Sequence, residues 1–109
     1  MGLLSDNFGY REITRDLLES IGFKEAKHLV MLVNSTRCYP YQLFINVSHL
    51  YNCYHQIIYI PEINELRVKE EIYIGRTNRE YSIKPTCFED IMVIVSNYKE
   101  KYGSIEFSR

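Results

Sequence analysis

The residues with the most metal-like chemistry are His49, Cys53 and His55. Cys53 and His55 would point to the same face of a strand, because side chains alternate along it. A zinc site needs four protein ligands, or three and a water molecule. The sequence offers neither a convincing fourth ligand nor a Cys-x-x-Cys pair. We therefore expect a structural or surface role for these residues, and we predict no metal site and no cofactor.

Other catalytic patterns are also missing from the sequence. The three cysteines, Cys38, Cys53 and Cys87, are widely spaced and are expected to be reduced, mostly buried thiols. No serine lies in a Gly-x-Ser-x-Gly elbow. The five glycines are scattered at positions 2, 9, 22, 75 and 103, which excludes a glycine-rich phosphate loop. We predict no catalytic residues and a non-enzymatic protein.

One triplet offers an alternative as an enzyme. Tyr73-Ile74-Gly75 resembles the second half of the signature of GIY-YIG nucleases, with Ile57-Ile58-Tyr59 in the place of the first half. The resemblance implies a metal-dependent nuclease with Arg79 as the catalytic arginine and Glu89 as the metal ligand. The sequence departs from that family in lacking the first glycine, and in following the second triplet with an expected strand where the family has a helix.

The same segment is also a candidate binding surface. Arg76, Asn78 and Arg79 lie in and beside an expected turn, Gly75 to Asn78, between Tyr73 and Tyr81. Arginines beside aromatic rings can bind phosphate, stack on bases, or act as anchors in protein interfaces. An ordinary solvated turn is the competing interpretation. These five residues are our candidate binding site.

Composition narrows the classes of function. The chain has 109 residues, of which 46% are hydrophobic and 25% charged, and these values fit one soluble domain spanning residues 1–109. The net charge of −1 leaves no surplus of cations for non-specific nucleic-acid binding, so any RNA contact would need a local patch. The longest near-apolar stretches, 29–33 and 91–95, are far shorter than the roughly 20 residues of a membrane span. We expect a cytoplasmic protein that does not contact a membrane.

The first half of the chain predicts one short helix followed by strands. Thr14 can cap a helix over 15–21 that Gly22 ends, with Phe23 folding back onto its apolar side. The apolar run 29–33 predicts a buried strand, and 34–40 predicts a loop. From Tyr41 apolar and polar residues alternate, with Phe44 on the polar side, which predicts a strand whose second face is partly covered.

The second half predicts further strands and a closing helix. Strands are expected over 54–60, from Leu66 to Ile74, and at 81–83, with Glu70 interrupting the apolar face of the second. Thr86 and Glu89 fit a capping box ahead of an amphipathic helix that ends before Gly103. The fold class is therefore α+β: an antiparallel sheet of about five strands, with a short N-terminal helix and a longer C-terminal helix on one face.

The layout resembles small accessory proteins of phages and prophages. The pattern Leu18 to Phe23 matches their opening helix, a tyrosine-rich set of strands follows, and the helix from Phe88 to Gly103 matches their closing helix. The resemblance implies a small inhibitor of a host macromolecule, as anti-CRISPR proteins are. We expect the partner to be a host protein or ribonucleoprotein, such as a defence nuclease or its guide RNA. The ten tyrosines, placed on the open sheet face, would supply a binding surface. A self-associating homodimer is the third alternative.

Overall fold

The computed structural model describes residues 10–48, 53–73, 76–102 and 105–106. Its centre is an antiparallel sheet whose long strands are neighbours in chain order: β4 (Tyr41–Ser48), β5 (Cys53–Ile60), β6 (Glu65–Tyr73) and β7 (Arg76–Ile83). Two short strands, β1 (Lys24–Glu25) and β8 (Ile105–Glu106), both pair with β4. The predicted α+β fold with an antiparallel sheet is confirmed.

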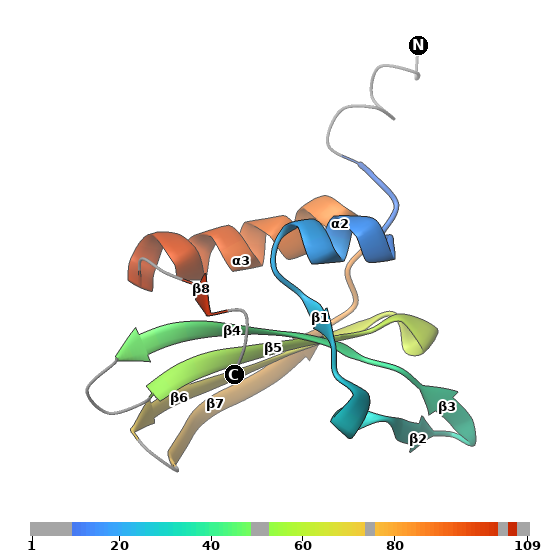
Figure 1. Cartoon of the computed structure of the whole chain (residues 1–109), viewed down its shortest axis with the longest axis horizontal. Coiled ribbons are helices and arrows are strands. Elements are labelled where there is room, and N and C mark those ends of the chain that lie inside the picture. The colour runs from blue at the N-terminus through green and yellow to red at the C-terminus, as the bar shows by residue number, and fades with distance from the viewer. Residues whose placement is uncertain (1–9, 49–52, 74–75, 103–104, 107–109) are drawn as a thin grey trace.

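Helices α2 (Arg15–Ser20) and α3 (Phe88–Tyr102) lie on the same side of this sheet (Figure 1). The predicted cap of α2 is present: the Thr14 hydroxyl accepts a hydrogen bond from the Leu17 amide at 3.2 Å. At the other end Gly22 has a φ of 110°, and the Phe23 amide donates to the Leu18 carbonyl at 3.0 Å. The chain can reverse there because glycine has no Cβ to clash at positive φ.

The core lies between the helices and one face of the sheet. Strand register places apolar residues in two cross-strand rows on this face. From β4 to β7 the rows are Tyr41, Tyr59, Leu66, Ile83 and Leu43, Ile57, Val68, Tyr81. Phe88, Ile91 and Val95 of α3 are buried against them, together with Leu18 and Phe23. The alternation predicted from Tyr41 onward is confirmed as far as Ile45, and the side chain of Val47 lies outside the described residues.

The predicted start of α3 needs a correction. Glu89 does not reach back to Thr86, because both of its carboxylate oxygens accept hydrogen bonds from Arg11, from the amide at 2.8 Å and from Nε at 2.7 Å. Asp90 takes the capping role and accepts from the Thr86 amide and hydroxyl, each at 2.8 Å. The Arg11 carbonyl also accepts from the Phe88 amide at 2.8 Å. The segment before α2 is thus tied to the first turn of α3.

Residues 29–40 also differ from expectation. The 3₁₀ helix η1 (Lys27–Leu29) is followed by β2 (Met31–Val33) and β3 (Thr36–Cys38), which pair in a separate ribbon. Asn34 and Ser35 form its two-residue turn, with φ angles of 51° and 68°. The predicted buried strand is therefore short and only partly buried, with Leu32 exposed, and the predicted loop contains a strand. We call residues 30–39 the arm, which projects from the end of the sheet, away from the helices (Figure 1).

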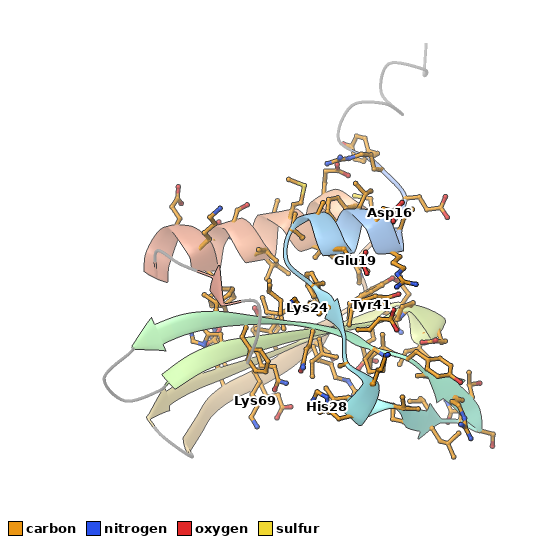
Figure 2. The ribbon with its side chains drawn as sticks, viewed as in Figure 1. Asp16, Glu19, Lys24, His28, Tyr41 and Lys69 are labelled. Carbon is orange, nitrogen blue, oxygen red and sulfur yellow. The ribbon has the colours of Figure 1, made fainter. Side chains whose placement is uncertain are left out.

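Four tyrosines lie on the core side of the sheet and not on the open face where the sequence placed a tyrosine-rich surface. Tyr41, Tyr59, Tyr81 and Tyr98 pack in or against the core beneath the helices. Tyr41 is on the helix side of the sheet and Lys69 on the opposite side (Figure 2). That opposite face carries Gln42, Gln56, Arg67 and Lys69, with Phe44 and Ile58 half-buried among them. The uncovered face is therefore mostly polar where its side chains are described, because the rings were needed to fill the core.

None of the helices in the described ranges is both long and apolar enough to cross a membrane.

Candidate functional site

The candidate binding site on the hairpin of β6 and β7 is described only in part. The expected turn over Gly75 to Asn78 is wrong in its second half, since β7 begins at Arg76. The side chains of Tyr73, Arg76 and Asn78 lie outside the described part of the structure, so their role in binding stays a prediction. Pairing along β6 and β7 shifts register between Glu70 and Tyr73, which confirms the irregularity predicted at Glu70. Arg79 and Tyr81 are described, and both face α3.

Arg79 lies at the end of a cross-strand row that contains three polar or charged residues. Register aligns Ile45, His55, Glu70 and Arg79 on the helix side, next to the apolar rows. Arg79 Nη2 donates to Glu70 Oε2 at 3.1 Å, and its guanidinium lies 5.5 Å from the centre of the Tyr81 ring. The Tyr98 hydroxyl of α3 donates to the same Glu70 oxygen. Its ring centroid lies 4.7 Å from that of His55. Tyr98 of α3 thus contacts a cluster of side chains that come from β5, β6 and β7.

The ionisation of this cluster follows from its geometry. Burial alone would raise the pKa of Glu70, but hydrogen bonds from Tyr98 and Arg79 outweigh it and hold that pKa below its ordinary value. Burial and the hydrogen bond to Glu70 raise the pKa of Tyr98 well above the usual range. Glu70 is therefore a carboxylate at neutral pH and Tyr98 a neutral donor. Their complementary states stabilise the contact between β6 and α3.

This cluster fits a structural role better than a catalytic one. The Glu70 side chain is 12% exposed, and its bonded oxygen is already shared by two donors. Glu89, the metal ligand implied by the nuclease resemblance, is engaged by Arg11. It precedes Tyr98 by nine residues, or about 13 Å along the helix axis. Arg79 and Glu89 thus belong to separate ion pairs. The nuclease alternative stays an untested prediction.

The other residues considered for chemistry are dispersed. His49 and the side chain of Cys53 lie outside the described residues, and His55 is buried under α3. Cys38 and Cys87 are both buried free thiols, as expected. Within the described ranges no three residues of the metal-binding types come together.

The arm exposes several large apolar side chains to solvent. Among the described residues five large apolar side chains are exposed, and three of them, Val30, Leu32 and Tyr39, belong to the arm. Leu32 is 70% exposed, although it sits in the middle of β2. Its cross-strand partner is Arg37. Val30, Met31, Leu32 and Arg37 line an open hollow of about 390 Å³. Exposed apolar side chains gathered in this way are typical of interaction sites.

The base of the arm is fixed to the domain. Ala26, Cys38 and Pro40 are buried there. The Ala26 amide donates to the Pro40 carbonyl at 2.9 Å, and the Tyr39 amide donates to Glu62 Oε2 at 3.1 Å. Glu62 belongs to η2 (Pro61–Ile63), which connects β5 to β6. Because the base is held by buried groups and hydrogen bonds, the arm can present Leu32 and Arg37 in a defined geometry.

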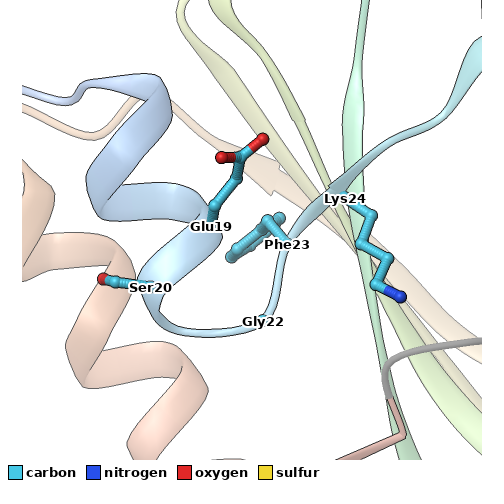
Figure 3. A pocket seen from close by; sticks show the side chains of 5 residues that line it. All are labelled: Glu19, Ser20, Gly22, Phe23 and Lys24. Atoms are coloured by element: carbon cyan, nitrogen blue, oxygen red, sulfur yellow. The ribbon is translucent and has the colours of Figure 1, made fainter.

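A second hollow lies where α2 runs into β1. It has a volume of about 290 Å³ and is lined by Glu19, Ser20, Gly22, Phe23 and Lys24. Glu19 and Lys24 extend away from each other, to either side of Phe23 (Figure 3). Glu19 is engaged by Arg15, whose Nε lies 3.1 Å from its carboxylate. Polar groups do not converge in this hollow, so it lacks the features of a ligand site.

Comparison with known proteins adds no functional assignment. No family model, no curated protein and no solved structure matches the chain. The arm and the hairpin must therefore be judged on their own geometry. Among the described side chains, the arm holds three of the five exposed large apolar residues.

The sequence contains a local signal for the arm. Met31 to Val33 and Thr36 to Cys38 are short runs rich in β-branched and apolar residues, separated by two polar residues. Two such runs with a two-residue connection of turn-forming residues are typical of a β-hairpin. The apolar composition of 29–33 suggested burial instead. A strand of three residues cannot be assigned to core or surface from its composition alone.

Proposed function

We propose that this protein is a small non-enzymatic binding protein that uses its arm to hold a partner protein. The observation that carries the proposal is the exposure of Leu32 and its neighbours on a ribbon anchored at its base. A soluble domain that exposes a cluster of apolar side chains usually covers it in a complex. Arginine and tyrosine, which occur at Arg37 and Tyr39, are enriched among the residues that dominate binding energy.

The resemblance to phage accessory proteins suggests the class of partner. If the protein acts as they do, the partner is a host defence nuclease or its ribonucleoprotein, and binding would occlude or remodel it. A stoichiometric inhibitor needs a rigid scaffold and a contact surface, and it needs no catalytic residues. The scaffold here is the sheet closed by α3, and the contact surface is the arm.

The proposal is tested by affinity purification from a bacterial lysate, with and without nuclease treatment. Three baits are compared: the wild type, Leu32→Asp, and Val93→Asp as a matched control. Val93 is also an exposed apolar residue, at 58%, but it lies on α3. We expect one stoichiometric protein that is retained by the wild type and Val93→Asp, is lost by Leu32→Asp, and survives nuclease treatment.

The other outcomes are equally informative. A partner lost only after nuclease treatment would show that nucleic acid bridges the contact, and would overturn direct binding to protein. Equal loss for both variants would mean that the arm has no special role. Because Leu32 is mostly exposed, Leu32→Asp should unfold at the same temperature as the wild type. A normal melting temperature would exclude misfolding as the cause of any loss.

A further inference from the structure

We infer that the arm binds a protein segment whose apolar side chains are flanked by carboxylates. The inference rests on the proposed function and specifies the chemistry of the partner. It follows from two features that coincide on the arm: an apolar hollow, and a local excess of positive charge. The hollow selects for apolar side chains, and the positive charge distinguishes an acidic partner from a neutral one.

The geometry places a cation beside the apolar contact. Leu32 and Arg37 are directly opposite each other on paired strands, so their side chains leave the ribbon on the same face. Both line the open hollow, together with Val30 and Met31. An apolar side chain that enters the hollow would bring its neighbours along the partner chain close to Arg37. The guanidinium can receive a carboxylate there in a two-pronged arrangement.

The charge around the arm differs from that of the whole molecule. Residues 24–39 contain three basic residues and one acidic residue, a net charge of +2, while the whole chain carries −1; Arg37 is the charged residue within the arm itself, and Glu62 at its base lowers the local sum to +1. The acidic residue, Glu25, is already paired with Arg15 at 2.6 Å. In the described structure no carboxylate lies within ion-pair distance of Lys27 or Arg37. These two cations are therefore available to a partner.

An alternative occupant would be a nucleic acid, since phosphate also binds arginine. The surroundings of Arg37 favour protein, because aliphatic side chains line the hollow and aromatic rings on which bases stack do not. An arginine beside an apolar contact favours a protein partner that carries a carboxylate next to its apolar side chains. We therefore commit to an acidic, apolar protein segment as the occupant.

The test is a selection from a random peptide library displayed on a carrier, with the full-length protein immobilised. Wild type, Val93→Asp, Leu32→Asp and Arg37→Glu are compared. We expect the first two to select peptides rich in Asp and Glu beside Leu, Ile or Phe. Leu32→Asp should select no common pattern. Arg37→Glu should bind the wild-type peptides about tenfold more weakly, which corresponds to about 1.4 kcal/mol, and should shift its own selection towards basic peptides.

The outcomes separate this inference from the proposed function. Selection of neutral or basic peptides by the wild type, or an unchanged preference in Arg37→Glu, would overturn the acidic partner even if the purified protein partner still depends on Leu32. Failure of the wild type to select any peptide pattern would overturn the inference as well, because a preformed hollow should bind short segments. Loss of the lysate partner with Val93→Asp and Leu32→Asp alike would instead overturn the proposed function.

Discussion

At the scale of single residues, Glu70 shows how a polar group in an apolar face is made to fit. Its neighbours in the row are Ile45 and His55 on one side and Arg79 on the other. A buried carboxylate without donors would cost several kcal/mol. Here Tyr98 and Arg79 donate to it, and the row becomes a fixed contact between sheet and helix. The interruption that looked like a strand defect in the sequence is therefore an attachment point for α3.

We predict that Glu70→Gln lowers the free energy of unfolding by about 1–2 kcal/mol, because hydrogen bonds to a charged acceptor are stronger than neutral ones. The contribution of Arg79 to this loss should be small, since its side chain is 64% exposed. Chemical denaturation measures the change, with Glu80→Gln, an exposed substitution on the neighbouring strand, as the control. A loss equal to that of the control would contradict the role given to Glu70.

The same contact predicts a pH dependence. The pKa of Glu70 is lower in the folded protein than its ordinary value of 4.5. Its contribution to stability is therefore fully present above pH 4.5 and is lost as the pH falls through the folded pKa. The difference between wild type and Glu70→Gln should shrink in that acidic range. A difference that stays constant as the pH falls would argue against a carboxylate acceptor.

At the scale of elements, α2 depends on its two ends. Six residues make too short a helix to persist without capping and packing. We predict that Thr14→Ala lowers the free energy of unfolding by about 1 kcal/mol, since the hydroxyl that accepts from the Leu17 amide is lost. Thr14→Ser keeps that hydroxyl and should be close to the wild type. Equal losses for both variants would indicate packing of the methyl group instead.

The turn of the arm offers a stabilising substitution. Ser35 has a φ of 68°, a region that costs a non-glycine residue about 1–2 kcal/mol. We predict that Ser35→Gly increases the hydrogen-exchange protection of amides in β2 and β3, and that Ser35→Val decreases it. The rest of the sheet should change little, because the ribbon is a separate sheet. Unchanged protection in both variants would contradict the turn geometry.

At the scale of the whole molecule, local signals predicted more than long-range ones. The caps of α2, the alternation along β4 and the amphipathic pattern of α3 each depend on residues that are close in sequence, and each was predicted correctly. Arg11 and Glu89 form an ion pair although they are 78 positions apart in the sequence, and no local pattern predicts such a contact. The tyrosines were misplaced for a similar reason. Composition identifies them as contact-forming, but only the packed fold shows that Tyr41, Tyr59, Tyr81 and Tyr98 make their contacts with the core.

The edges of the sheet bear on self-association. At one edge β1 and β8 cover part of β4, while β7 has no neighbouring strand on its outer side in the described structure. The register shift beside Asn78 and the inward-facing charge of Arg79 are features that discourage pairing at an edge. We therefore predict a monomer from micromolar to submillimolar concentration, measured by sedimentation equilibrium. A dimer at micromolar concentration would support the alternative of a self-associating domain.

The contact surface itself is tested most directly by hydrogen exchange on the complex with the partner recovered by the wild-type protein. Amides across residues 30–39 should become protected on binding, while those of β7, including Arg79 and Tyr81, should exchange as in the free protein. That result would assign the contact to the arm. Protection confined to β6 and β7, with the arm unchanged, would contradict the account and return the binding site to the hairpin at Tyr73 to Tyr81.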